Sequence, residues 1–315
     1  MGNNGFHNVP DWPPSSPPFQ SPALLPEASE RPKVLLPAIL FAATVLTTLL
    51  AGIRMQIGFL EQTAIPPLTE PRTWLLGVPF SFTLLSILMA HELGHFVMCR
   101  YYGITATYPH LLPAPPPLPF GTFGAVIRIK SPFGSARQVF DVGIAGPIAG
   151  FVVLIPALLY GLSRSQVFVE APAGGIEFGE PLLFKLLSDL LFSSPEPSIN
   201  LHPVGWAAWF GMLATSLNLL PIGQLDGGHI IYALFGPRTH RLVSIAGLLL
   251  LSAVSLASLP LPGYLLFGIL LLLIGFRHPQ PMAEGDKLGS GRWLLALFSL
   301  LILILTFILV PVRIS

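Results

Sequence analysis

The chain has 315 residues, of which 52% are hydrophobic and only 10% are charged. Soluble globular domains carry about 25% charged residues, so this composition excludes a soluble protein and predicts an integral membrane protein. The formal net charge of +1 offers no concentrated basic surface for phosphates, so nucleic acid is not expected as a partner.

The N-terminal segment 1–33 is rich in proline and poor in apolar residues, and we expect it to be a disordered cytoplasmic tail. No basic region leads directly into a short apolar segment with a small-residue cleavage site. The first membrane span is therefore expected to act as an uncleaved insertion signal. Residues 34–74 should hold this first transmembrane helix and an external loop.

Seven apolar stretches approach the roughly 20 residues that a helix needs to cross a bilayer. The fourth is interrupted, and a Pro-Gly turn at 260–263 makes the fifth and sixth a helical hairpin that spans fully or enters shallowly. The predicted fold is an all-α integral membrane protein, a bundle of about six to seven transmembrane helices. The stretches are 34–52, 75–100, 140–162, 203–235, 242–259, 263–276 and 293–311.

Two histidines lie near the end of the second stretch, in His91-Glu92-Leu93-Gly94-His95. On a helix, His91 and His95 share one face and can bind one zinc ion, while Glu92 stands beside them to handle protons. Ionisable groups at membrane depth each cost roughly 2.5 to 3.5 kcal/mol and persist mainly when they are functional or paired. The alternative is that the histidines only cap or pack a helix end.

A third ligand is expected because a catalytic zinc usually has three protein ligands and leaves one position for water. The best candidate is Asp226, which lies among Pro221, Gly223 and Gly227 in the fourth stretch. These residues break the helix, and irregular backbone at membrane depth is tolerated only around protein or a wet cavity. Asp226 is also suited to cap the half-helix that follows it, a role compatible with ligation.

Together these segments resemble the two signatures of the site-2 protease family, zinc metalloproteases that cut substrates within the membrane. His-Glu-x-x-His and Asn-x-x-Pro-x-x-x-Leu-Asp-Gly both occur here, at 91–95 and 218–227. The resemblance covers roughly residues 75–235, expected to form the metalloprotease core, with 236–315 as C-terminal transmembrane helices. It implies Zn²⁺ as cofactor, Glu92 as general base and three ligands: His91, His95 and Asp226.

The resemblance has further implications. Asn218 is similar to the family residue thought to bind near the oxyanion, its alternative being an ordinary hydrogen bond between helices. The Gly-rich stretch 143–150 also resembles the family, but Gly150 stands where many members have Asn, so that residue's polar contact is not carried over. The interval 163–200 is too short for the PDZ domain of many members, which indicates the PDZ-less branch of bacterial, cyanobacterial and plastid enzymes.

Orientation follows from the Lys and Arg residues of the connecting loops. With a cytoplasmic N-terminus and seven crossings, eleven of these cations lie inside and five outside. We therefore expect a multi-pass protein with a cytoplasmic N-terminus and with its active site toward the cytoplasmic side. The resemblance to the family implies the bacterial cell inner membrane as its location. Residues 181–192 are expected to form an amphipathic helix on the outer membrane surface.

A β element is predicted between the second and third spans. Residues 123–130 alternate and are rich in branched side chains, and they follow a stiff proline run at 113–119. An exposed strand edge offers hydrogen bonds to an unwound substrate, whereas the alternative is a loop that only connects spans. The candidates for this contact, in a small membrane-associated β element near the active site, are Phe123, Gly124, Ala125, Val126 and Ile127.

The sequence thus predicts a zinc-dependent endopeptidase that hydrolyses a peptide bond within or near a transmembrane segment of a membrane protein, as in regulated intramembrane proteolysis. The alternatives are a zinc-binding membrane transporter and an inactive protease-like scaffold. A transporter is expected to have paired helix breaks in two repeated halves, and a pseudoprotease to lack a ligand or the base. The single cysteine, Cys99, is expected to be a packing residue. His229 is expected to support the metal site, to pack between helices or to contact lipid headgroups. His110, His202, His240 and His278 are expected to be ordinary interfacial residues.

Overall fold

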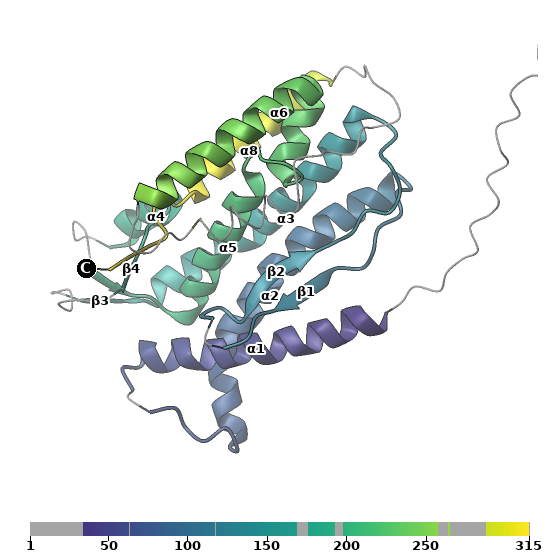
Figure 1. Ribbon diagram of the computed structural model, residues 1–315. Coiled ribbons are helices and arrows are strands. Elements are labelled where there is room, and N and C mark those ends of the chain that lie inside the picture. Colours follow the sequence, from purple (N-terminus) through teal and green to yellow (C-terminus); the bar gives the residue numbers. More distant parts are fainter. Residues whose placement is uncertain are drawn as a thin grey trace, which may run out of the picture. The chain divides into compact units, whose positions relative to one another are not determined.

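The computed structural model describes residues 34–62, 64–116, 118–168, 176–192, 198–257, 264 and 288–314. Four of the helices in these ranges are long and apolar enough to cross a membrane (Figure 1). The predicted membrane-embedded helical fold is confirmed in this form, whereas the predicted count of six to seven spans is not. The four are α1 (Leu35–Phe59), α2 (Pro71–Tyr101), α3 (Ala136–Ser163) and α6 (Asp226–Ala257). The predicted tail, the 260–263 turn and nearly all of the predicted sixth span lie outside the described residues.

Helix α2 is the central element of the described region, because it packs against α1 on one side and against α3 and α5 (Pro203–Leu219) on another. Small residues bring these helices close. A Cβ on Gly77 would lie 2.3 Å from the carbonyl oxygen of Leu49 in α1, and one on Gly94 would lie 2.4 Å from that of Ala145 in α3. Any larger side chain at either glycine would therefore force the two helices apart.

The fourth predicted span is divided, as its prolines and glycines indicate. Helix α5 ends at Leu219, a loop of residues 220–225 follows, and α6 begins at Asp226. Gly223 in this loop has a φ of +55°, a conformation that glycine adopts at little cost.

After the loop of residues 220–225, the chain is interrupted again inside α6, at Gly236 (φ 79°, ψ 178°), directly before Pro237. Beyond this break the chain returns past the loop, where a Cβ on Gly247 would lie 3.0 Å from the Ile222 side chain. The predicted boundary between the fourth and fifth spans therefore coincides with the kink at which two helical segments of α6 meet.

The predicted strand is present as β2 (Thr122–Val126), paired antiparallel with β1 (His110–Pro113). An isolated bridge between Ala106 and Ile129 extends the ribbon toward the end of α2. The sequence did not reveal β1, because its four residues show no alternation and lead into the proline run. The hydroxyl of Thr47 in α1 donates to the carbonyl oxygen of Gly121 at 2.6 Å and fixes the turn of the ribbon.

Shorter elements lie around the end of α3 and the start of α5 (Figure 1). The helix expected at 181–192 is α4 (Leu182–Leu191), which buries Leu183 and Phe184 and exposes Leu186 and Leu190. Apolar helix α8 (Ser290–Thr306) packs against α3, α4 and α5. Two short antiparallel pairs complete the described elements: β3 (Gln166–Phe168) with β5 (Ser198–Asn200), and β4 (Ile176–Phe178) with β6 (Val312–Ile314).

Candidate metal centre

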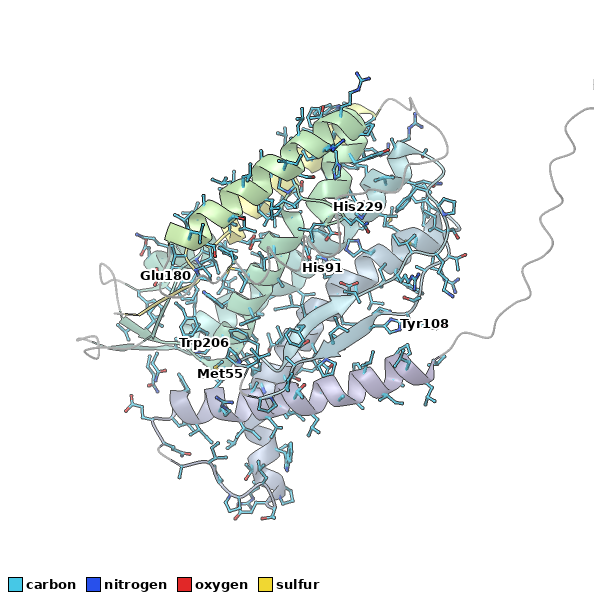
Figure 2. The ribbon with its side chains drawn as sticks, viewed as in Figure 1. Met55, His91, Tyr108, Glu180, Trp206 and His229 are labelled. Carbon is cyan, nitrogen blue, oxygen red and sulfur yellow. The ribbon has the colours of Figure 1, made fainter. Side chains whose placement is uncertain are left out.

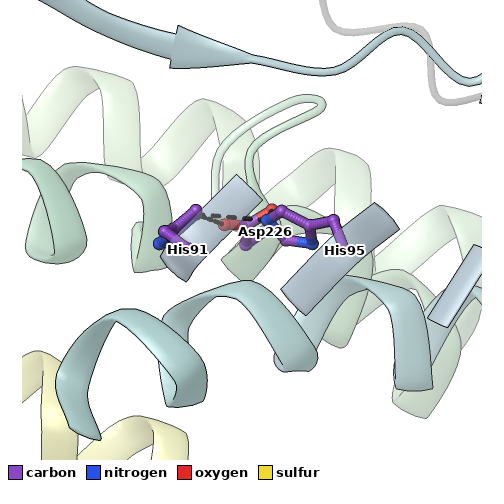
Figure 3. Close-up of side chains that lie close together, drawn as sticks. All are labelled: His91, His95 and Asp226. Atoms are coloured by element: carbon purple, nitrogen blue, oxygen red, sulfur yellow. Dashed lines mark hydrogen bonds and ion pairs between the residues drawn. The ribbon is translucent and has the colours of Figure 1, made fainter. Parts of the chain in front are cut away.

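Three predicted ligands meet at one point between α2 and α6 (Figure 3). His91 and His95 lie one turn apart on the buried face of α2, and their Nε2 atoms are 3.1 Å apart. Asp226, the first residue of α6, brings Oδ2 to 3.0 Å from Nε2 of His91 and Oδ1 to 3.3 Å from Nε2 of His95. Each side chain is at most 13% exposed.

These distances fit a tetrahedral metal ion. Bonds of about 2.0 to 2.1 Å at tetrahedral angles separate two ligand atoms by about 3.3 Å. The two Nε2 atoms are close to this separation, and each of them lies 3.0 or 3.3 Å from a different oxygen of Asp226. The donor set of two imidazoles and one carboxylate is also one that catalytic zinc sites use. The residues present therefore fit the ion that the sequence predicts.

The ring of His95 is oriented by helix α3. Its Nδ1 lies 2.7 Å from the carbonyl oxygen of Val142. A carbonyl oxygen only accepts, so Nδ1 carries the proton and the lone pair of Nε2 faces His91 and Asp226. Hydrogen bonds of this kind fix the tautomer and the ring of a metal ligand. Val142 has no chemical signature in the sequence, because it acts through its backbone.

The Gly-rich stretch of α3 provides the space for both imidazole rings. A Cβ on Gly146 would lie 2.1 Å from Nε2 of His95, and one on Gly150 would lie 3.2 Å from Cβ of His91. Gly143 faces His229 in the same way, at 2.8 Å from its Cβ. His229 therefore packs between α6 and α3, which is one of the roles predicted for it.

Glu92 is 6% exposed and lies between the two histidines in the sequence. The backbone of Ile127, directly after β2, lies near its carboxylate. Figure 2 shows His91 among the helices and Tyr108 at the β1–β2 ribbon. The ribbon thus reaches the residue predicted to be the general base.

The other predicted site residues lie around this centre. Asn218, in the last turn of α5, has Nδ2 3.4 Å from Nε2 of His91. In β2, Phe123 is 63% and Val126 49% exposed, and Gly124 has a φ of +106°. Within the described residues β2 pairs with β1 alone, so its other edge has no strand beside it there.

His240 is a supporting residue that the sequence did not reveal. The interpretation of it as an ordinary interfacial residue is wrong, because it is 2% exposed and its Nε2 donates to the carbonyl oxygen of Gly223 at 2.8 Å. The N–H of Gly223 donates in turn to the hydroxyl of Ser244 at 3.1 Å. The part of α6 beyond Gly236 thus holds the loop that leads to Asp226. A His and a Ser four residues apart on one helix face were the only signal.

The fold and the site define a class: a membrane-embedded helical protein with a buried His-His-Asp centre beside a β ribbon. The family model of Peptidase family M50 matches residues 79–261, more than half of the chain. The chain belongs to this family, which confirms its resemblance to the site-2 proteases.

Curated plant proteins are similar to this chain. The Arabidopsis thaliana protein named "Probable zinc metalloprotease EGY1, chloroplastic" is 29% identical over 295 residues, covering 87% of this chain and 52% of that protein. "Probable zinc metalloprotease EGY2, chloroplastic" of the same plant is 31% identical over 242 residues, covering 72% and 41%. The chain spans about half the length of the curated relatives it matches.

Proposed function

We propose that this protein is a zinc-dependent intramembrane endopeptidase that cuts a peptide bond within or near a transmembrane segment of a membrane-protein substrate. The observation that carries the proposal is the convergence of three buried donor atoms from α2 and α6 within 4.8 Å of one another. The family and the names of the relatives support zinc as the ion. In this proposal the ligands are His91, His95 and Asp226.

Each polar residue around the ion has a distinct role in the proposed reaction. Bound zinc would supply Lewis-acid chemistry, since such an ion lowers the pKa of water and polarises a carbonyl. Glu92 accepts the proton of the attacking water and returns it to the leaving amine. The amide of Asn218 donates toward the oxyanion of the scissile carbonyl. The Val142 carbonyl keeps the ring of His95 in the tautomer that presents Nε2.

The proposed substrate is held as an extended strand. A peptide bond in a transmembrane helix is shielded by its own hydrogen bonds, so the helix must open before hydrolysis, and a strand edge replaces the lost bonds. The contact between Glu92 and the backbone of Ile127 supports this role for β2, because it brings the strand to the general base. The proposed contact residues are Phe123, Gly124, Ala125, Val126 and Ile127.

The proposed setting is a lipid bilayer, with the N-terminus and the active site on the cytoplasmic side of a bacterial cell inner membrane. The loop distribution of Lys and Arg supports this orientation. The plant relatives are named as chloroplastic proteins. A zinc transporter or an inactive scaffold is less well supported, because all three ligand positions and the base position are filled.

The test is cleavage of a transmembrane substrate by the full chain in liposomes. We expect Glu92→Gln to abolish cleavage while zinc content stays native, because the base does not hold the ion. Glu70→Gln, an exposed acid at the other end of α2, is the matched control and should cleave normally. Mass spectrometry of the fragments locates the cut. Cleavage by Glu92→Gln at the native rate would overturn the assignment.

A further inference from the structure

One charged cluster outside the metal centre joins the ends of three helices. Asp141, in the second turn of α3, has a side chain that is only 12% exposed. Arg292, in the first turn of α8, donates from Nε to Oδ1 at 2.8 Å and from Nη2 to Oδ2 at 2.6 Å. The hydroxyl of Tyr102, directly after α2, donates to the same carboxylate. The cluster therefore ties the end of α2 to the starts of α3 and α8.

The geometry of this pair is specific. Two parallel N–H···O bonds between a guanidinium and a carboxylate fix the orientation as well as the distance of the two groups. Asp141 is also the only acidic residue between positions 93 and 169 of the sequence. Arg292 is 151 residues away in sequence, so the pair forms only in the folded protein.

The cluster lies next to the group that orients a metal ligand. Val142 follows Asp141 directly, and its carbonyl oxygen accepts the Nδ1–H of His95. Gly146, one turn further along α3, has no side chain that would push the imidazole ring of His95 away from this carbonyl. A shift of this turn of α3 would move the acceptor and rotate the ring that presents Nε2.

We propose that Arg292 is a positioning residue of the metal centre, which acts through Asp141 and the Val142 carbonyl on the ring of His95. This inference rests on the zinc ligands of the proposed function. Arg292 lies outside residues 79–261 that the family model matches, whereas Tyr102 and Asp141 lie inside them. Helix α8 thereby couples a part of the chain beyond the family region to the site.

Zinc affinity of the full chain in detergent, measured by competition with a zinc chelator and without substrate, tests this coupling. Arg292→Met should weaken zinc binding about tenfold, the lower end of the effect of outer partners of metal ligands. The zinc affinity of Arg292→Lys should lie between those of the native protein and Arg292→Met, because an ammonium keeps the charge but not the bidentate hydrogen bonds. Arg241→Met removes an exposed arginine on α6 and should bind zinc as the native protein does.

Each variant is measured below its own melting temperature, so that only folded protein is compared. A merely structural pair would lower the melting temperature of the zinc-free protein and leave zinc affinity unchanged, and that result would overturn the inference. If Arg292→Met does not fold, the affinity of Arg292→Lys decides. Failure of the native protein to bind zinc would instead overturn the proposed function itself.

Discussion

The two contacts of α2 are built in the same way and differ in what they enclose. Near its start, Gly77 lets α1 approach until the Leu49 carbonyl blocks any side chain, and Gly94 does the same for α3 near its end. The first contact encloses a hydroxyl pair, Thr48 and Ser81, 2.7 Å apart. The second encloses imidazoles that meet the carboxylate of Asp226. Both contacts are thus close helix–helix packing. The polar groups that each contact encloses determine whether it can also bind a metal ion.

The polar groups of the two contacts also differ in how they are satisfied. Thr48 additionally donates to the carbonyl oxygen of Thr44 within its own helix, so the hydroxyl pair is complete without any ligand. Two imidazole Nε2 atoms that face each other and a carboxylate at 3.0 to 3.3 Å form a concave set of donors for a cation. In the proposed function the second contact therefore holds an ion, whereas the first needs none.

Removing one of the proposed ligands should have the largest effect of these changes. We expect Asp226→Ala to lose zinc and to abolish proteolysis, because two imidazoles alone do not form a three-ligand site. Asp189→Ala, an exposed aspartate on α4, is the matched control. Zinc content after desalting and cleavage in liposomes are the readouts. Stoichiometric zinc in Asp226→Ala would remove this residue from the ligand set.

Adding one methyl group at each contact should affect zinc binding at one contact and helix packing at the other. In Gly146→Ala the new Cβ would lie 2.1 Å from Nε2 of His95, so the ring must move, and zinc affinity should fall about 10- to 100-fold. Gly77→Ala forces α1 and α2 apart instead, at a cost of about 1 to 3 kcal/mol in unfolding free energy. Its folded fraction should bind zinc normally. Equal zinc affinity in both variants would show that α3 does not shape the site.

The smallest effect is expected at the hydroxyl pair. Thr48→Val keeps the shape of the side chain and removes the bond to Ser81, and hydrogen bonds between membrane helices contribute about 0.6 kcal/mol on average. Thermal unfolding should register this small loss, while zinc affinity and cleavage stay native. A change in zinc affinity would mean that the two ends of α2 are coupled.

The three proposed ligands could be named from the sequence because each of them lies in a recognisable local pattern. His91 and His95 are four residues apart on a helix, and Asp226 follows a cluster of helix breakers at membrane depth. Strand β2 was predictable from its alternation. The number of spans was less so, because hydropathy cannot tell the break at Gly236 from the end of a span.

The groups that support the ligands were not predictable, because they depend on contacts between distant segments. Val142 acts through a carbonyl, which every residue possesses. His240 reaches Gly223 only after α6 has turned back at Gly236. The pair of Asp141 and Arg292 spans 151 residues and leaves no spacing to recognise. Only the folded chain brings these groups to the site.

The coordination shell of bound zinc tests the central claim most directly. X-ray absorption at the zinc edge of the purified full chain should reveal two imidazole nitrogens at about 2.0 to 2.1 Å and a carboxylate oxygen at about 2.0 to 2.2 Å. The spectrum of Asp226→Ala should lack that set. A shell without two imidazoles, or a native protein that takes up no zinc, would contradict the account.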